Sequence, residues 1–287
     1  MVRLIAFLVG VFFSGMLLLG LGDTIVGAIK EPATATAEHE FHEHALAEKY
    51  TFDGPLGKFD RGQLQRGLKV YKEVCSACHS LKLVSFRDFT ALGYNEDEVK
   101  AIAKGWTTEV PSINPETGEP ATRPGIPADK IPSPFANETA ARAANNNALP
   151  PDLSLITKAR EGGPAYVYSL LLGYREQVGY KNEEGKELLK EFPDAATPPG
   201  LNFNPWFANL NIAMAEPLGA DDQVTYDDGT KATKAQMAKD VSAFLAWTAE
   251  PKMENRKSAG LAALGFLLIF TMLAWMSYKA IWADKKH

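Results

Sequence analysis

The chain has 287 residues, of which 23% are charged, and its formal net charge is −5. This acidic balance gives no support to a polyanion partner, so we expect no nucleic-acid binding and favour an electropositive protein partner. The surplus length lies in apolar ends and proline-rich connections, which predicts one globular domain with long loops rather than two domains.

The N-terminal segment is apolar. Arg3 leads into an uncharged run from Leu4 to Gly22. Residues 1–30 are therefore interpreted as either a signal peptide or an N-terminal anchor. The small-residue pattern A-T-A occurs twice between residues 33 and 37, but it lies further from the apolar run than a signal peptidase normally accepts. Both alternatives stay open.

Residues 31–59 are interpreted as a linker. The part from Glu31 to Thr51 is rich in Ala, Glu, Thr and His and has no apolar period, so we expect it to be solvated and to contribute nothing to a core. Three histidines, His39, His42 and His44, belong to this part and are expected to face solvent.

Residues 60–252 carry four predicted helices and form the folded domain. Asn95 with Glu98, and Thr233 with Gln236, have the spacing of capping boxes. The predicted helices run from about residue 61 into the cysteine motif, over residues 95–105, over residues 164–172, and from residue 233 to a stop at Pro251.

A proline-rich segment interrupts these helices. From Pro111 to Pro134 there are seven prolines in twenty-four residues. We expect them to forbid a regular element and to give an ordered or partner-facing loop. The polar stretch from Val224 to Thr230 is expected to form a hairpin at most.

The C-terminal segment is predicted to cross a membrane. Twenty residues from Ala259 to Tyr278 carry no charge, about the length of a spanning helix, and they lack the amphipathic face of a buried soluble helix. Residues 253–287 are therefore assigned to a single transmembrane anchor and a short tail. Because Lys279, Lys285 and Lys286 follow the run, we expect the folded domain on the periplasmic side of the cell membrane.

The only two cysteines, Cys75 and Cys78, are followed by His79 in the sequence C-S-A-C-H. This is the attachment motif of a c-type haem: two thiols at the end of a helix add to the two vinyl groups of one porphyrin, and the adjacent histidine binds iron. A thioredoxin-type dithiol requires a βαβ pattern, which is missing. A structural zinc site requires two further ligands, for which only the three linker histidines are candidates.

A sixth iron ligand is sought among the methionines, because Met and His are the usual partners of the proximal histidine in electron-transfer haems. Met214 alone stands in a loop, while Met237 belongs to the apolar stripe of the last predicted helix and Met253 lies at the membrane approach. The remaining methionines lie in the apolar ends. Met214 is therefore the candidate ligand, and a core-filling role is the alternative.

Two motifs and several longer blocks resemble the cytochrome c1 family. The motifs are C-S-A-C-H at residues 75–79 and I-A-M-A-E-P-L at residues 212–218. The chain departs from the family pattern in lacking a clean cleavage site and an extra cysteine pair, which excludes the accessory disulfide of some relatives. The similar blocks lie at residues 142–154, 166–174, 203–207, 226–230 and 240–251, so that the resemblance runs from about Phe52 to the C-terminus.

The resemblance implies a mainly α fold: a class I cytochrome c domain with long loop insertions, over residues 60–252, and one C-terminal transmembrane helix in the lipid. It implies one covalently attached haem c, with His79 and Met214 as axial ligands and Arg142 as a partner of a haem propionate. It also implies single-electron transfer from a Rieske iron–sulfur protein to a soluble or anchored cytochrome c. The assembly would be a quinol:cytochrome c oxidoreductase, with cytochrome b as the third core partner.

Three further expectations come from the residues themselves. Arg142 offers a planar fork suited to a buried carboxylate, although an ordinary surface arginine is the alternative. The rigid turn from Pro150 to Leu153 is predicted to place a carbonyl against the free ring nitrogen of His79. Acidic clusters at residues 96–98, 221–222 and 227–228 are either solvated surface or a means to steer a basic cytochrome.

Two rival functions are kept. A haem closed by His79 and Met214 has no open position, so the chain alone performs electron transfer and no substrate chemistry. The rival within this class is another membrane-anchored c-type cytochrome, such as a terminal-oxidase subunit. The rival from a different class is a haem enzyme or gas sensor, which requires an open sixth position.

Overall fold

The structure, a computed structural model, describes residues 2–30 and 34–284. Helices dominate it, and the only strands among these residues form two short antiparallel pairs. The α-helices are α1 (Val2–Lys30), α2 (Ala37–Phe41), α3 (Arg61–Glu73), α4 (Glu96–Lys104), α5 (Glu138–Ala144), α6 (Ile156–Ala159), α7 (Gly163–Leu172), α8 (Leu188–Glu191), α9 (Lys234–Ala249) and α10 (Met253–Trp282). The 3-10 helices are η1 (Cys75–Ala77), η2 (Phe86–Leu92) and η3 (Pro193–Ala195), and the strands are β1 (Val110–Ile113), β2 (Pro120–Arg123), β3 (Asn202–Phe203) and β4 (Asn211–Ile212).

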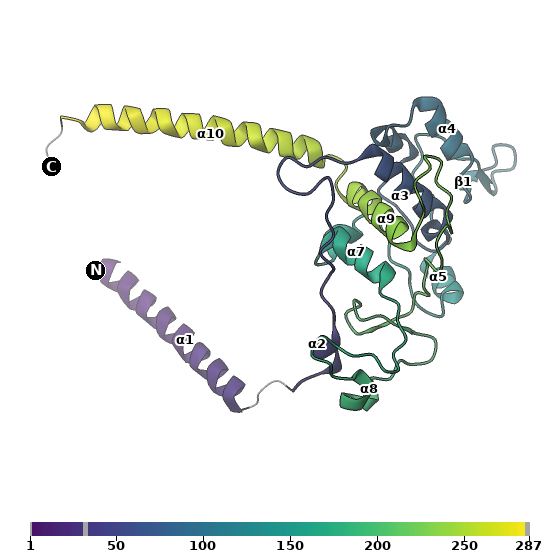
Figure 1. Ribbon diagram of the computed structural model, residues 1–287. Coiled ribbons are helices and arrows are strands. Elements are labelled where there is room, and N and C mark those ends of the chain that lie inside the picture. Colours follow the sequence, from purple (N-terminus) through teal and green to yellow (C-terminus); the bar gives the residue numbers. More distant parts are fainter. Residues whose placement is uncertain (1, 31–33, 285–287) are drawn as a thin grey trace.

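The crossing of α3 and α9 forms the centre of the main core (Figure 1). Gly67 makes it possible, because a Cβ added there would lie 2.1 Å from the carbonyl oxygen of Asp240 and 2.6 Å from Cβ of Phe244. Only hydrogen fits at such a contact. Helices α6 and α7 pack on α9, and α4 packs on η2. The helix that leads into the cysteine motif is thereby fixed to the last helix before the membrane anchor.

The four predicted helices are confirmed as α3, α4, α7 and α9, with one correction to the caps. The Asn95–Glu98 capping box is present at the start of α4. At the start of α9 the Thr233 side chain accepts from the backbone N–H of Gln236, but the Gln236 side chain donates to Asp240 rather than back to the cap. The buried carboxylate of Asp240 thus binds the Gln236 side-chain amide in place of the cap backbone.

The proline-rich segment contains a regular element, so the prediction that it forbids one is wrong. Strands β1 and β2 pair antiparallel from Val110 opposite Arg123 to Ile113 opposite Pro120. In a two-stranded ribbon both strands are edges, so a proline that lacks an N–H donor is tolerated on the outer side. By contrast, residues 224–230 form turns, and the second strand pair is β3 with β4.

The segment before residue 59 carries core residues, against expectation. Ala37, Phe41 and Tyr50 are buried. Phe41 lies on α2 and joins a second small core with Leu188, Phe203 and Leu210. The polar composition of the segment was a poor guide, because the burial depends on partners about 150 residues away in the chain. His39, His42 and His44 are exposed, as predicted.

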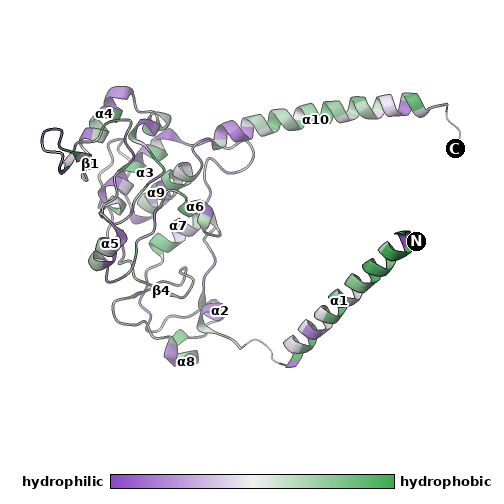
Figure 2. Cartoon of the chain, turned by 180° about the vertical axis from the view of Figure 1, so that it is seen from behind, coloured by the Kyte–Doolittle hydropathy of each residue, from purple (hydrophilic) through white to green (hydrophobic). Residues whose placement is uncertain are grey.

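Helices α1 and α10 are both long and apolar enough to cross a membrane, and the apolar window of each is wholly unburied. Both extend away from the folded domain (Figure 1), and Figure 2 shows that hydrophobic residues predominate along them. The prediction of a C-terminal anchor is confirmed by α10, and whether α1 is a signal peptide or a second anchor stays open. Lys285, Lys286 and Ala33 lie outside the described residues.

Candidate haem site

The cysteine motif forms a single tight turn at the end of α3. The helix ends at Glu73, and η1 then carries Cys75 into a turn in which the backbone N–H groups of Cys78 and His79 both donate to the carbonyl of Cys75, at 3.1 and 2.9 Å. Cys75 is half-buried and Cys78 is exposed. The two thiols and the imidazole therefore belong to one compact unit whose position is set by α3.

The ring of His79 is held in a defined tautomer. Its Nδ1 lies 2.9 Å from the carbonyl oxygen of Pro151. A carbonyl can only accept, so Nδ1 carries the hydrogen and Nε2 keeps a lone pair for a metal. Burial lowers the pKa of His79, although the hydrogen bond to Pro151 and the charge of Asp152 oppose this. The predicted contact between the proline turn and the free ring nitrogen is confirmed.

A carboxylate missed by the sequence analysis fixes the turn that holds His79. Asp152 accepts from Ser80 Oγ at 2.7 Å, from the backbone N–H of Lys82 at 2.8 Å and from that of Ser154 at 3.0 Å. Burial alone would raise the pKa of Asp152, but these hydrogen bonds outweigh it and hold the pKa below its usual range. The D-x-S sequence after two prolines was the available signal, since it is typical of an Asx turn.

Met214 lies in a loop whose backbone is tied down. The loop follows β4, which pairs with β3 through Ile212 opposite Asn202. The carbonyl of Met214 accepts from the Tyr174 hydroxyl at 3.1 Å and from Asn202 Nδ2 at 3.2 Å. The Met214 side chain is half-buried. Its backbone is thus held by side chains from two separate parts of the chain.

The other two methionines of the folded domain are core residues. Met237 is 0% exposed on α9, and Met253, at the start of α10, is 6% exposed. Both belong to the main hydrophobic cluster. The core-filling reading therefore describes Met237 and Met253 better than Met214. Ligation by Met214 stays a prediction.

Arg142 lies on α5 and is exposed. Its guanidinium donates to the carbonyl of Asn147 at 3.1 Å, and the N–H of Asn147 donates back to the carbonyl of Arg142 at 2.9 Å. Asn146 and Asn147 both have positive φ, 50° and 63°, which asparagine tolerates better than most residues. Its predicted role with a propionate stays a prediction.

The segment that follows Arg142 contacts the His79 ring and the approach to β3. A Cβ on Gly200, two residues before β3, would lie 2.6 Å from Asn146 Nδ2, so the Asn146 side chain lies against Gly200. Further along the same segment, Pro151 binds the ring of His79. Residues 146–151 therefore lie beside both the His79 ring and the chain that leads into β3.

The alternatives for the cysteines lose their support. Both sheets in the described part of the chain are two-stranded and antiparallel, which is not a βαβ context. Burial raises the pKa of the Cys75 thiol to about 12, whereas a redox-active dithiol has a lowered pKa. Within residues 2–30 and 34–284 no three His, Cys, Asp or Glu side chains are grouped so that they could share a metal ion.

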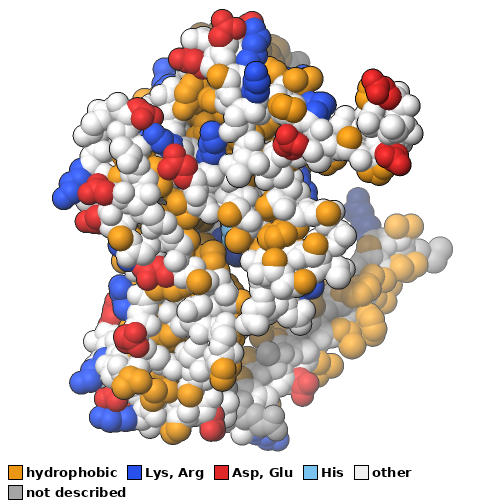
Figure 3. All heavy atoms as spheres, turned by 90° about the vertical axis from the view of Figure 1, so that its right-hand side faces the viewer, with side chains coloured by type: hydrophobic (Ala, Val, Ile, Leu, Met, Phe, Trp, Pro, Cys, Tyr) orange, Lys and Arg blue, Asp and Glu red, His pale blue; other side chains and the backbone are white. Residues whose placement is uncertain are grey.

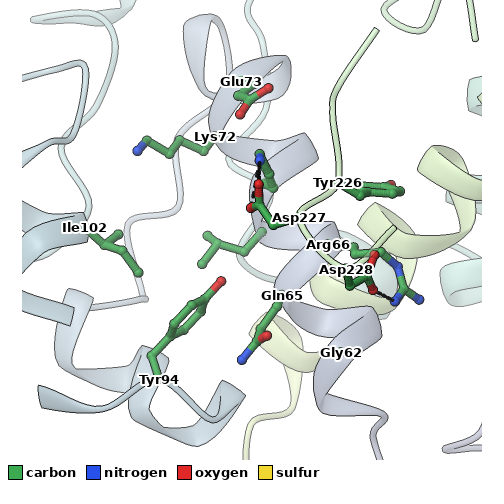
Figure 4. A pocket seen from close by; sticks show the side chains of 12 residues that line it. Gly62, Gln65, Arg66, Lys72, Glu73, Tyr94, Ile102, Tyr226, Asp227 and Asp228 are labelled. Atoms are coloured by element: carbon green, nitrogen blue, oxygen red, sulfur yellow. Dashed lines mark hydrogen bonds and ion pairs between the residues drawn. The ribbon is translucent and has the colours of Figure 1, made fainter. Parts of the chain in front are cut away.

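A groove of about 390 Å³ lies away from these residues, between α3, α4 and the turn at Tyr226 (Figure 4). None of the candidate haem residues lines it. Lys69 pairs with Asp227 at 2.8 Å and Arg66 with Asp228 at 2.7 Å along its rim. One of the predicted acidic clusters is thus partly neutralised by α3. Acidic and basic side chains are also intermixed over the face of the molecule shown in Figure 3.

The sequence comparisons decide the family. The family model described as "Cytochrome C1 family" matches residues 50–285. The chain belongs to the cytochrome c1 family. Cytochrome c1 of Rhodospirillum rubrum is 47% identical over 247 residues, covering 84% of this chain and 88% of the relative. The mitochondrial cytochrome c1 heme protein of Kluyveromyces lactis is 42% identical over 275 residues, covering 95% and 88%. A cytochrome b/c1 of Bradyrhizobium diazoefficiens is 43% identical over 275 residues, covering 93% of this chain but 39% of that longer relative.

Family membership confirms the resemblance drawn from residues 75–79 and 212–218. It also confirms the mainly α fold with a C-terminal anchor, because α10 supplies the apolar helix that the family pattern requires. The chain is therefore a membrane-anchored c-type cytochrome, and its role lies in haem-based electron transport.

Proposed function

We propose that this chain is the cytochrome c1 subunit of a quinol:cytochrome c oxidoreductase. It would accept single electrons from a Rieske iron–sulfur protein and pass them to a soluble or anchored cytochrome c. The observation that carries the proposal is the His79 ring, whose Nδ1–H is committed to Pro151 so that Nε2 is free for iron, within a chain that matches the family over residues 50–285.

The chain's own donors suit one covalently attached haem c. Cys75 and Cys78 would form the thioethers, and His79 and Met214 would be the axial ligands. The bound haem supplies a one-electron couple. The hydrogen bond from Nδ1 to Pro151 fixes the ring and increases its basicity, as outer contacts of metal-bound histidines do. With Met214 as the second ligand, its thioether would raise the reduction potential, which would suit an acceptor from a high-potential iron–sulfur centre.

Arg142 is proposed to stabilise a haem propionate. A guanidinium binds a carboxylate through two parallel N–H donors, which is stronger than a neutral hydrogen bond. Arg142 already supports the turn at Asn147, and the preceding Asn146 lies against Gly200, two residues before β3. Its remaining donors are exposed and would be available to a propionate.

Cytochrome b and a Rieske protein are the proposed neighbours in the membrane. The relative named cytochrome b/c1 has both names in a single chain, and a relative from Candida albicans, 42% identical over 257 residues, is named as the catalytic subunit of a cytochrome b-c1 complex. These names support assembly of this chain with a cytochrome b.

The folded domain is proposed to face the periplasm, with the end of α10 in the cytoplasm. Positive residues favour the cytoplasmic side, and Lys279 lies at the end of the uncharged run. Protease treatment of spheroplasts is expected to degrade the haem-staining fragment. Protection of that fragment until the membrane is broken would reverse the orientation.

The functional proposal is tested by purifying the intact complex through a tag on this chain. We expect cytochrome b and a Rieske protein to co-purify. Quinol is expected to reduce the c-type haem of this chain, and the reduced complex to pass electrons to added cytochrome c. Co-purification with oxidase subunits, or a c-type haem that quinol does not reduce, would contradict the proposal.

A further inference from the structure

A loop before α3 is fastened to the first turns of the membrane helix. The backbone N–H of Phe59 donates to Glu254 Oε1 at 2.9 Å. Lys257 Nζ donates to the carbonyls of Phe52, at 2.6 Å, and Gly57, at 3.3 Å. The loop from Phe52 to Phe59 is therefore tied to the start of α10 at both of its ends.

The base of this loop is packed and its tip is not. Tyr50, Phe52 and Phe59 are buried, and their rings contact in sequence with centroids 4.9 Å apart. Leu56, at the tip, is 75% exposed. Gly57 is needed for the sharp bend beside it, because a Cβ there would lie 2.2 Å from the carbonyl oxygen of Asp53. A rigid base thus presents one large apolar side chain outward.

Lys257, which holds the loop, lies just before the apolar run of α10. The uncharged run of α10 from Ala259 to Tyr278 is about 30 Å long at 1.5 Å per residue, which equals the thickness of the hydrocarbon core. Lys257 precedes this run by two residues, or about 3 Å along the axis, and the headgroup layer is roughly 5–8 Å thick on each side. Figures 1 and 2 both show the loop alongside the start of α10.

We propose that Leu56 and its loop form a second membrane contact, in which the leucine side chain enters the interfacial layer of the lipid bilayer beside α10. Lys58, two residues after the tip, and Lys252, at the N-cap of α10, are exposed and suit lipid phosphates. The occupant is lipid because the loop continues the surface by which α10 already enters the bilayer. Two contacts fix the tilt of the haem domain over the membrane, which one helix alone does not.

The test uses the full haem-loaded chain in lipid nanodiscs, with the haem kept ferrous and the two native cysteines occupied by the haem. A nitroxide label is attached at Leu56→Cys. Matched labels are placed at Ile113→Cys, an exposed apolar site on β1 at the end of the domain away from α10, and at Leu261→Cys within the span. Collision rates with oxygen, which enters lipid, and with a water-soluble nickel chelate are measured for each label.

We expect the oxygen-to-nickel ratio at residue 56 to exceed that at residue 113 several-fold and to approach the ratio at residue 261. A ratio equal to that at residue 113 would overturn the proposal, because the tip would lie in water. Low collision rates with both reagents, in nanodiscs holding the intact complex, would also overturn it, because another subunit would then cover the tip. Neither outcome depends on electron transfer, so the proposed function is tested separately.

Discussion

Replacement of Gly67 by alanine tests whether the contact between α3 and α9 sets the position of the haem motif. The added Cβ would lie 2.1 Å from the carbonyl oxygen of Asp240, whereas ordinary contacts begin at 3.4 Å. To remove this clash, α3 and α9 must separate by ~1.3 Å, the difference between the two distances. The side chain of the same Asp240 is fully buried and binds Arg66 at 2.9 Å. Overpacking costs about 1–3 kcal/mol, and alanine returns up to about 1 kcal/mol through helix propensity.

The separation also strains the Arg66–Asp240 ion pair, so we expect Gly67→Ala to lose about 2 kcal/mol of unfolding free energy. For a domain of this size that loss corresponds to a Tm lowered by about 4–8 °C. The matched control is Gly62→Ala on the same helix, where the nearest atom to the new Cβ is 3.4 Å away. Thermal unfolding of both variants is followed by far-ultraviolet circular dichroism in detergent. Equal Tm values for the two variants would refute the packing argument.

Three further predictions concern charge and hydrogen bonding. Asp152→Ala removes the acceptor that fixes the Pro151 turn, and we expect about 1–3 kcal/mol less stability in urea unfolding; an unchanged midpoint would contradict this. Hydrogen bonds from Thr230 and Arg66 lower the pKa of Asp228 to about 2, so its contribution to stability is present above the unfolded pKa and lost as pH falls from about 4 to 2. As pH falls over that range, the unfolding free energy of the parent should therefore decrease more steeply than that of Asp228→Asn. Parallel curves of unfolding free energy against pH would show that ionised Asp228 does not contribute to stability. Finally, stopped-flow association with a basic cytochrome c should slow as salt rises, and flat rates would show that the acidic clusters are only solvated surface.

Local signals predicted the four longest helices of the folded domain, and the shorter α2, α5, α6 and α8 were not predicted. The helix α4 begins with a complete capping box at Asn95, and α7 carries proline in its first turn. These features act within a few residues, so the sequence alone reveals them. The α3 helix was found from the spacing of apolar residues on the face that contacts α9.

What the sequence did not reveal depends on distant partners or on sheet position. Phe41 is buried only because Leu188 and Phe203 reach it from elsewhere in the chain. Pro111 is tolerated in β1 because that strand has a single neighbour. Asp152 was missed as the residue that fixes the His79 turn, since its partners Ser80 and Lys82 lie about 70 residues away.

The two candidate iron ligands, His79 and Met214, were predicted from different kinds of signal. His79 was assigned from an adjacent-residue motif whose chemistry is specific, and its contact with Pro151 followed from a rigid turn. Met214 was assigned by elimination and by the family resemblance. The structure strengthens the elimination, because Met237 and Met253 are core residues.

Carbon monoxide binding by the reduced Met214→Leu variant tests the central claim most directly, that a thioether closes the haem of an electron-transfer protein. Leucine preserves the volume but has no sulfur, so the sixth position should open while Cys75, Cys78 and His79 keep the haem attached. Met237→Leu is the matched control, because it changes a fully buried methionine at a cost of less than about 1.5 kcal/mol. We expect rapid carbon monoxide binding by Met214→Leu and none by Met237→Leu or the parent. Rapid binding by the parent itself, or a Met214→Leu variant that excludes carbon monoxide and keeps the far-red methionine–iron band, would contradict the account.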